Sequence, residues 1–417
     1  MRPCDPDPAP RSTAGRAIDP AGSKRSVRGQ KNPSIEEKSV SADVEQFQAI
    51  AINRLAQTLE RAGRSVLHLE FGQPSAGAPR QAIAAAQLAL ANPVPGYWES
   101  PDLKARLSRH YRETYGIAAD PDRFVLTCGA SAALVLALAC YFTPGERIAL
   151  ARPGYVAYRN TIRALHLQAV EIPCGARSRY QLTADHLAGI EPAPHGLIIA
   201  SPANPTGTII AAAELERIAA VCRDRGIRII SDEIYHGLSF AEPTRSMQQF
   251  DPHSTVIGSF SKYFCMPGWR LGWALVPDAD LDRARRYVGN LFLTAPSLSQ
   301  HAALAAFEAR TELDGHLETY RRNRDRLLDA LPQLGLQRIA PPDGAFYLYL
   351  DVRHLTNDSP SFCRHLLQDT GIATAPGVDF DPIDGRHFMR ISFAVSTAEI
   401  EEALARVTPW FAERRVR

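Results

Sequence analysis

The sequence predicts an α/β protein, in which a large domain with a mostly parallel sheet flanked by helices is joined by a smaller α/β domain. Short apolar runs alternate with segments of helical periodicity between about residues 90 and 290, an alternation typical of parallel sheets. The length of 417 residues allows two or three domains at roughly 150 residues each. A hydrophobic content of 45% provides enough apolar side chains for cores of that size.

Domain boundaries follow from composition and periodicity. Residues 1–42 are rich in Pro, Gly, Ser and charged residues, so we expect them to form a disordered tail. We assign residues 43–90 to the N-terminal part of the small domain and residues 91–299 to the large domain. Residues 300–417 are assigned to the C-terminal part of the small domain.

Composition and charge argue against several classes of partner. The formal net charge is +2, from 47 basic and 45 acidic residues, so nothing favours nucleic acid or an anionic membrane surface. No apolar run approaches the ~20 residues that a membrane-spanning helix needs. The seven cysteines are scattered without the spacing of a disulfide framework or a metal site. We therefore expect a cytoplasmic protein without a nucleic-acid, membrane or metal partner.

The first elements are a helix and a short strand. The helix is predicted to start at Ser41, its N-cap, and to end near Gly63. A strand over residues 66–71 follows, and Gly72-Gln73-Pro74 breaks it as a turn. The apolar face of the helix is predicted at helical spacing and comprises Val44, Phe47, Ile50, Ala51 and Leu55.

The segment from Thr255 to Val276 contains the most informative pattern. An apolar strand ends in Ser259-Phe260-Ser261-Lys262, and a Pro-Gly turn then leads to Arg270. A lysine at the end of a buried strand is costly unless its charge is paired or neutralised. A Schiff base with an aldehyde cofactor is one chemical use for it, and the hydroxyls and guanidinium suit a phosphate. Taken alone, the segment also allows a solvated turn with an exposed lysine.

Three other strand ends carry polar groups. The strand over residues 124–127 runs through Cys128-Gly129-Ala130-Ser131-Ala132 into an apolar helix, whose free N–H groups could bind an anion. Asp232 ends an apolar strand, where a buried carboxylate needs a cationic partner. Alternatively, Asp232 caps a helix or forms a structural ion pair. Arg390 lies in an alternating strand and could bind a carboxylate through two parallel hydrogen bonds, or form a structural ion pair.

These motifs together resemble the class I/II pyridoxal-phosphate-dependent aminotransferases, which are fold-type I enzymes. The match to Ser-x-Ser-Lys followed by Pro-Gly-Trp-Arg-x-Gly is specific, because Lys262, both serines and Arg270 fall at the family spacing. The resemblance extends from about residue 44 to residue 411. Further matches are Asn204-Pro-Thr-Gly, Asp232-Glu-Ile-Tyr235 and Arg390-Ile-Ser-Phe-Ala.

The resemblance implies a role for each motif residue. Lys262 would bind pyridoxal 5′-phosphate (PLP) in the large domain and act as the catalytic base. Tyr97 would reach across a dimer to the partner's cofactor phosphate; its compact Tyr-Trp-Glu-Ser-Pro loop leaves a core or interface aromatic as the alternative. The other cofactor-binding residues would be Ala130, Ser131, Ala132, Ser259 and Arg270 at the phosphate, Tyr155 on the ring face, Asp232 at the ring nitrogen, and Asn204 and Tyr235 at the phenolic oxygen. The substrate-binding residues would be Gly72, Asn204 and Arg390, with Arg390 holding the α-carboxylate.

The implied function is transamination between an L-amino acid and a 2-oxo acid, in a homodimer with shared active sites. A PLP-dependent lyase, or another enzyme acting through a Cα carbanion, remains an alternative because the same cofactor stabilises any such carbanion. A PLP-sensing regulator without catalytic activity is a further alternative. The amino-acid donor cannot be identified from these motifs.

Overall fold

The computed structural model describes residues 44–92 and 96–415. The tail expected over residues 1–42 therefore lies outside the described residues. Within the described part of the chain, no helix is long and apolar enough to cross a bilayer. The proposed boundaries at residues 90 and 299 stay a prediction.

A seven-stranded sheet forms the centre of the protein, in the order β2-β8-β7-β6-β5-β3-β4. Strand β8 pairs antiparallel with both β2 and β7, and the other neighbours are parallel, as the strand–helix alternation predicted. The strands are β2 (Phe124–Thr127), β3 (Arg147–Arg152), β4 (Gln168–Pro173), β5 (Gly196–Ala200), β6 (Arg228–Asp232), β7 (Thr255–Ser259) and β8 (Gly272–Leu275).

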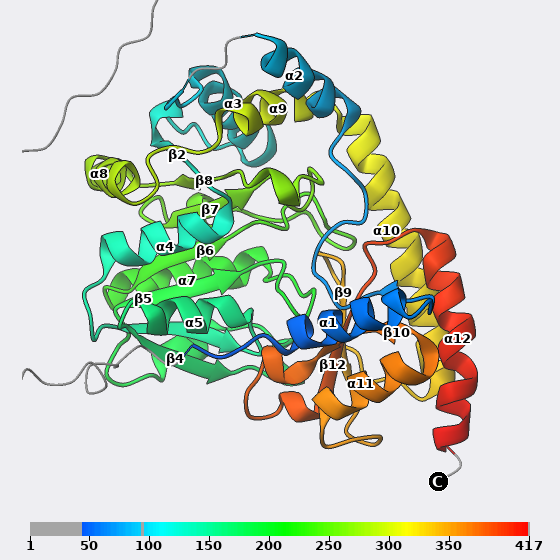
Figure 1. Ribbon diagram of the computed structural model, residues 1–417. Coiled ribbons are helices and arrows are strands. Elements are labelled where there is room, and N and C mark those ends of the chain that lie inside the picture. Colours follow the sequence, from blue (N-terminus) through cyan, green and yellow to red (C-terminus); the bar gives the residue numbers. More distant parts are fainter. Residues whose placement is uncertain (1–43, 93–95, 416–417) are drawn as a thin grey trace, which may run out of the picture. The chain divides into compact units, whose positions relative to one another are not determined.

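Helices cover both faces of this sheet (Figure 1). In β5, Ile198 packs into the core with α4, α5 and α8, whereas Leu197 and Ile199 face α6 and α7. This alternation explains why the central strands are apolar throughout, since both of their faces are buried. The helices of these two layers are α4 (Ala130–Tyr141), α5 (Val156–Ala164), α6 (Ala184–Ala188), α7 (Ala212–Asp224) and α8 (Leu281–Leu291).

A third group of helices packs against β2, β7 and β8. It comprises α2 (Arg80–Ala91), α3 (Pro101–Tyr115) and α9 (Ser297–Ala306). Ser100 caps α3 by accepting a hydrogen bond from the N–H of Leu103, and Gly116 ends the helix with a φ of 71°. These two caps define a helix of 15 residues.

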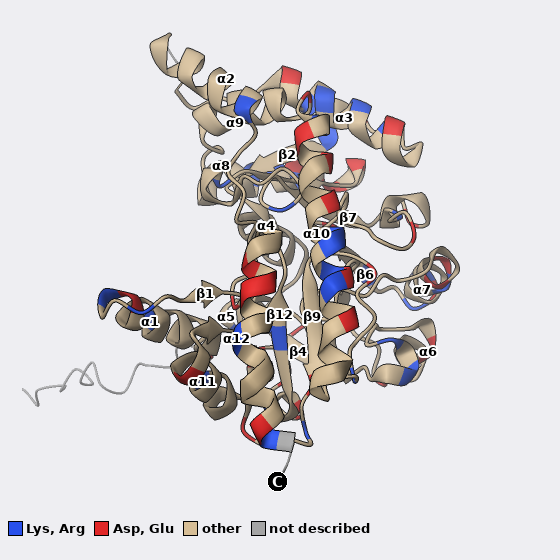
Figure 2. Ribbon diagram, turned by 90° about the vertical axis from the view of Figure 1, so that its right-hand side faces the viewer, with Lys and Arg blue, Asp and Glu red and all other residues tan. Residues whose placement is uncertain are grey.

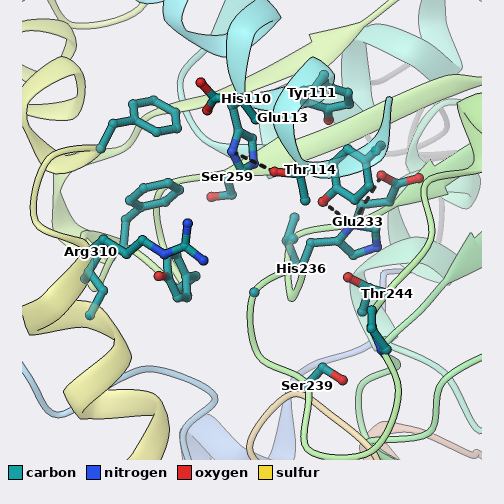
Figure 3. A pocket seen from close by; sticks show the side chains of 18 of the residues that line it. His110, Tyr111, Glu113, Thr114, Glu233, His236, Ser239, Thr244, Ser259 and Arg310 are labelled. Carbon is teal, nitrogen blue, oxygen red and sulfur yellow. Dashed lines mark hydrogen bonds and ion pairs between the residues drawn. The ribbon is translucent and has the colours of Figure 1, made fainter. Parts of the chain in front are cut away.

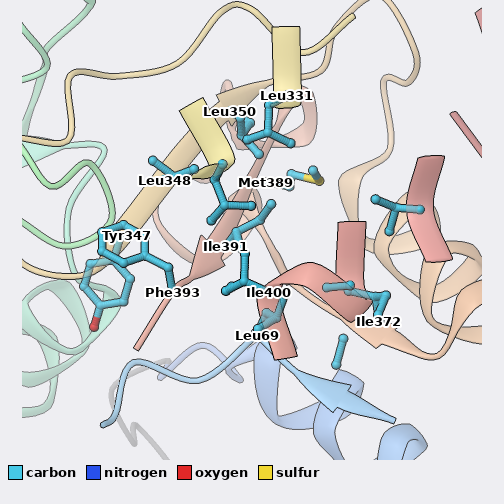
Figure 4. Close-up of a cluster of buried hydrophobic side chains, with 14 of the residues drawn as sticks. Leu69, Leu331, Tyr347, Leu348, Leu350, Ile372, Met389, Ile391, Phe393 and Ile400 are labelled. Atoms are coloured by element: carbon cyan, nitrogen blue, oxygen red, sulfur yellow. The ribbon is translucent and has the colours of Figure 1, made fainter. Parts of the chain in front are cut away.

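Both ends of the described chain meet in a separate core (Figure 4). Its strands form a three-stranded antiparallel sheet, β11-β12-β9, and a parallel pair, β1-β10. Leu69 from the N-terminal part packs there with Ile391 and Ile400 from the C-terminal part. The elements are α1 (Gln48–Arg61), β1 (Leu67–His68), α10 (Arg310–Ala330), β9 (Tyr347–Asp351), α11 (Ser359–Thr370), β10 (Ile372–Ala373), β11 (Ala375–Pro376), β12 (Phe388–Ser392) and α12 (Thr397–Arg415).

Charges of both signs lie side by side on the exposed helices, as α10 shows clearly (Figure 2). Pairs one turn apart include Arg310 with Asp314 and Arg321 with Glu318, each at 3.5 Å. Exposed pairs of this kind contribute about 0–1 kcal/mol each, so they maintain a polar surface more than they stabilise the fold.

Two expectations for the N-terminal part were wrong. Ser41, the expected N-cap, lies outside the described residues, but residues 44–47 are not helical and α1 begins at Gln48; the strand expected over residues 66–71 is reduced to β1. The buried face of α1 is formed by Ala49, Ile52 and Ala56. Val44 and Ile50, which were predicted on that face, are 54% and 40% exposed. The reason is tertiary: Asp379 accepts the N–H groups of Gln48 and Ala49 and so fixes where the helix starts.

Candidate active site

A cavity of about 470 Å³ lies at the carboxyl ends of β5, β6 and β7. Asn204 follows β5, Asp232 ends β6, Ser259 ends β7, and Lys262 comes three residues later. Ligands of open α/β sheets bind at this edge, because the loops after parallel strands converge there. The structure thus brings together residues of three motifs that are up to 58 positions apart in the sequence.

Lys262 projects into this cavity, where its Nζ donates to the backbone carbonyl of Gly72. Burial, together with the nearby Arg390 and Arg270 charges, lowers the pKa of Lys262 to about 8, although Asp232 acts in the opposite direction. A substantial fraction of the amine is therefore neutral near pH 8, which a nucleophile or general base requires.

Asp232 is buried at the end of β6 and makes two hydrogen bonds. Its Oδ2 accepts from the hydroxyl of Tyr158 at 2.5 Å, and its Oδ1 accepts from the N–H of Ile234 at 3.2 Å. Burial raises the pKa of Asp232, and these two hydrogen bonds oppose the rise. No motif pointed to Tyr158, and the only signal in the sequence was its position one helical turn after Tyr155. In the structure the rings of these two tyrosines lie 5.4 Å apart.

A candidate anion site lies where β2 turns into α4. Gly129 adopts a φ of 82° before the helix, and a Cβ placed on it would lie 2.4 Å from Nη2 of Arg270. Ala130 and Ser131 line the cavity at the first turn of α4, next to Arg270. A guanidinium at a helix N-terminus with small residues suits a phosphate group.

Ser259 stands beside this anion site. Its Oγ accepts a hydrogen bond from the N–H of Ser261 and lies 3.0 Å from the Ser261 hydroxyl. Ala132, which the sequence also placed at the phosphate, is buried in α4 and is not among the residues that line the cavity. The cavity lining thus includes two of the three predicted residues of this turn.

Arg390 lies on β12 and faces the same cavity. Its Nη1 donates to Oδ1 of Asn204 at 2.8 Å and its Nη2 donates to the carbonyl of Glu70. Its Nε is buried and has no hydrogen-bond partner among the described residues. The guanidinium carbon lies 4.5 Å from the centre of the Tyr347 ring and 4.7 Å from that of Phe380. The side chain is thus held in place, while the Nε–H group and the second hydrogens of Nη1 and Nη2 remain for a ligand.

Tyr347 connects several of the predicted residues, although no motif pointed to it. Its hydroxyl lies 2.7 Å from the hydroxyl of Tyr235. It also restricts Gly72, because a Cβ on that glycine would lie 2.2 Å from the Tyr347 oxygen. The glycine after β1 is therefore required for close approach of the two segments.

Tyr97 lies outside the cavity of its own chain. Its side chain is 85% exposed, and it follows the undescribed residues 93–95 closely. No lining residue of the cavity belongs to this part of the chain. The expectation that Tyr97 reaches a partner subunit's phosphate stays a prediction.

A second cavity, of about 450 Å³, lies beside the first (Figure 3). Asp232 and Tyr235 line the first cavity, whereas the neighbouring Glu233 and His236 line the second. Burial lowers the pKa of His236 to about 3, so this histidine is neutral and has a structural role between Tyr115 and the carbonyl of Ser201. Burial likewise raises the pKa of Glu233 to about 8.

Comparison with known proteins identifies the family. A model of the family aminotransferase class I and II matches residues 64–407. The chain therefore belongs to this family. It is a pyridoxal-phosphate-dependent aminotransferase that moves an amino group between an L-amino acid and a 2-oxo acid, as the resemblance implied.

Two relatives illustrate the range of this family. The valine–pyruvate aminotransferase of Mycobacterium tuberculosis is 45% identical over 379 residues, which is 89% of this chain and 98% of the relative. The (5-formylfuran-3-yl)methyl phosphate transaminase of Methanocaldococcus jannaschii is 31% identical over 371 residues, which is 87% of this chain and 96% of that relative.

Solved structures share the fold of this aminotransferase. The crystal structure of an aminotransferase from Mycobacterium tuberculosis gives a TM-score of 0.87 at 44% identity, covering 90% of this chain and 99% of that chain. The aspartate aminotransferase from Thermus thermophilus with maleate gives 0.82 at 28% identity, covering 88% and 97%. The predicted fold-type I architecture is thereby confirmed.

Proposed function

We propose that this aminotransferase binds PLP at Lys262 and transfers the amino group of amino acids with apolar side chains to a small 2-oxo acid. We further propose that it acts as a cytoplasmic homodimer whose active sites are shared. The observation that carries the cofactor assignment is the convergence of a lysine with a lowered pKa, a hydrogen-bonded aspartate and an anion site in one cavity.

The residues of the cavity suit each part of PLP. The phosphate suits the first turn of α4 with Ser259 and Arg270, and the protonated ring nitrogen suits the buried carboxylate of Asp232. Tyr155 supplies an aromatic face beside the ring position. Once bound, PLP supplies an aldehyde that links covalently to amines and a ring that withdraws electrons from the substrate Cα.

The protein contributes positioning and proton transfer. Arg390 binds the substrate carboxylate and orients the Cα–H bond toward Lys262. Lys262, as a neutral amine, takes the proton from Cα of the donor in the first half-reaction. In the second half-reaction it returns a proton to Cα of the new amino acid. Asn204 and Tyr235 hold the phenolic oxygen, and the contacts of these two residues with Arg390 and Tyr347 keep them in place.

The charges of the cavity support an apolar donor. Among the described residues that line it, the cations are Lys262, Arg270 and Arg390, and each already has a proposed role. No further lining cation is available to pair with a side-chain carboxylate. The rest of the lining is largely apolar and includes Phe47, Ile50, Phe71, Leu134 and Phe380. The name of the Mycobacterium tuberculosis relative, valine–pyruvate aminotransferase, supports the same donor class.

Two observations support the proposed assembly and compartment. Tyr97 is 85% exposed, which suits a side chain that reaches a second subunit. The six described cysteines are all free, which suits a reducing compartment.

The visible absorption spectrum of the purified protein tests the proposed function. We expect a PLP band that bleaches on adding L-valine or a similar donor and returns on adding pyruvate. L-aspartate serves as the acidic control and should bleach the band far less. A protein that shows no band even after PLP is added would contradict the cofactor assignment, and irreversible release of oxo acid would favour a lyase.

A further inference from the structure

Residues 44–50, here called the N-terminal strap, form one wall of the catalytic cavity. The ring of Phe47 meets that of Tyr155 edge-on, with centroids 6.0 Å apart. Ala49 packs in one small core with Phe380, the residue that lies against the Arg390 guanidinium. The strap thus contacts two other lining residues of the cavity, Tyr155 and Phe380. Its residues that line the cavity are Phe47, Ala49 and Ile50.

One end of the strap is fastened to α5. The Glu45 carboxylate accepts from Arg159 at 2.6 Å and from Arg163 at 2.7 Å. Asn160 holds the backbone of the same residue, accepting from its N–H at 3.3 Å and donating to its carbonyl at 3.0 Å. Burial acts to raise the pKa of Glu45, but the hydrogen bonds from Arg163 and Arg159 outweigh it and lower that pKa. The carboxylate is therefore ionised at neutral pH and firmly paired.

The other end is fastened by Asp379. This side chain, 3% exposed, accepts from the N–H of Gln48 at 2.7 Å and from that of Ala49 at 2.8 Å. Asp379 therefore caps the N-terminus of α1. Phe47, the residue at the N-cap position, has no side chain that could accept these hydrogen bonds. Because Phe380 follows Asp379 directly, the cap also fixes the strap relative to the wall beneath Arg390.

A donor side chain in this cavity would meet the ring of Phe47, which belongs to its lining. A donor whose carboxylate binds Arg390 and whose Cα lies near Lys262 extends its side chain along the apolar lining. A rigid wall limits the volume available there, whereas a mobile one would adapt to larger side chains.

We propose that Phe47 determines the size of the donor side chain, and that Glu45 and Asp379 are positioning residues that hold it in place. This inference rests on the proposed function, because it concerns the substrate pocket of the same site. Glu45 lies outside the cavity lining, whereas Asp379 belongs to the lining and holds the strap through the N–H groups of Gln48 and Ala49.

The substitution Phe47→Ala tests the size limit. We expect the ratio of kcat/KM for L-phenylalanine to that for L-valine to rise by about tenfold or more, since a cavity opens where the ring was. Phe292→Ala, which removes a phenylalanine outside the cavity lining, is the matched control and should leave the ratio unchanged. If the wild-type enzyme prefers another donor class, the ratio is measured for a larger and a smaller donor of that class. A ratio that Phe47→Ala leaves unchanged overturns the size limit.

Glu45→Gln tests the anchor independently of turnover. Amide hydrogen exchange is measured over residues 44–50 of the cofactor-free protein, and we expect it to speed up by about tenfold or more. Glu171→Gln is the matched control, because Glu171 pairs with the same Arg159, at 3.1 Å, without touching the strap. Equal exchange in the two variants overturns the anchoring role of Glu45, whatever the enzyme's substrates prove to be.

The kinetics of Glu45→Gln separate positioning from general loss of stability. A loosened strap should raise KM for L-valine several-fold with kcat nearly unchanged, because the carboxylate and proton-transfer groups are intact. Asp379→Asn should act in the same direction. A wild-type enzyme that turns over no apolar donor contradicts the proposed function alone. If the wild type is active and both variants have the same KM as the wild type, this inference alone is contradicted.

Discussion

Tyr158 donates its phenolic hydrogen to Oδ2 of Asp232 at 2.5 Å, and both side chains are buried. The hydroxyl favours the ionised form of an aspartate whose pKa burial would otherwise raise. Asp232 is the group proposed to keep the cofactor ring nitrogen protonated, which it does only as a carboxylate. Helix α5 therefore holds the Asp232 carboxylate in place through Tyr158.

Tyr158→Phe should weaken cofactor binding without removing it. Loss of one hydrogen bond to a charged group costs about 2 kcal/mol, which corresponds to roughly a thirtyfold weaker affinity. The dissociation constant for PLP, measured by absorbance titration, checks this. Tyr155→Phe, which keeps the aromatic ring and removes the neighbouring hydroxyl, is the control and should bind nearly as wild type. Equal affinity of the Tyr158→Phe variant and the wild type would remove Tyr158 from the proposed site.

Lys262→Ala should abolish turnover while leaving the cofactor bound without a covalent link. The anion site at α4 and the Asp232 carboxylate are untouched by this change, so both ends of PLP keep their partners. Single-turnover measurements with L-valine, together with cofactor content after gel filtration, check both halves. Transamination at the wild-type rate would show that Lys262 was wrongly assigned.

The strand ends that hold the chemistry could be predicted from the sequence. Asp232 ends β6, and Asn204 and Lys262 follow the ends of β5 and β7 within a few residues; parallel strands bring such ends to one edge. Arg390 was found in the same way, from its place in an alternating strand that proved to be β12. Local pattern was sufficient because each of these residues lies in a regular strand or just after one.

Residues fixed by distant contacts could not be found in this way. The start of α1 is set by Asp379, about 330 positions along the chain, so no local signal placed it at Gln48. Tyr347 lies in a buried strand where any large apolar residue would fit the pattern equally well. Ala132 was placed at the phosphate from the motif alone; its side chain is buried, and a contact through its backbone stays a prediction. In each case packing decided what the local pattern left open.

Arg390→Leu should mainly impair binding of the amino acid. The side chain would lose the donors that face the cavity, while Lys262 and the anion site remain, so KM should rise by about a hundredfold, or roughly 3 kcal/mol. Arg390→Lys is the matched variant and should restore little, because a lysine cannot present two parallel N–H groups. Steady-state kinetics with L-valine check both changes. Normal substrate binding in the leucine variant would make Arg390 a structural residue.

Lys262 should also reduce the stability of the cofactor-free protein, in a pH-dependent way. Its pKa falls from 10.5 to about 8 in the folded state, so between these values the unfolded chain binds more protons than the folded one. Stability contributed by this group therefore rises with pH from about 8 to about 10.5 and is lowest below pH 8. Replacing it removes that penalty, so cofactor-free Lys262→Met should be more stable than wild type at pH 7. The gain is at most about 3 kcal/mol, and less because the cavity admits water.

Urea unfolding of the two cofactor-free proteins at pH 7 and at pH 9.5 checks this sign. The advantage of Lys262→Met should be largest at pH 7 and should shrink at pH 9.5, because the wild-type amine has by then lost its proton in the folded state. Lys104→Met, at a lysine paired with Glu99 at 2.5 Å, is the control and should be less stable than wild type at pH 7. A Lys262→Met variant no more stable than wild type at pH 7 would mean that the folded protein holds the charged lysine without cost. The amine would then be protonated at neutral pH, and Lys262 would lack the basicity that its proposed proton transfer requires.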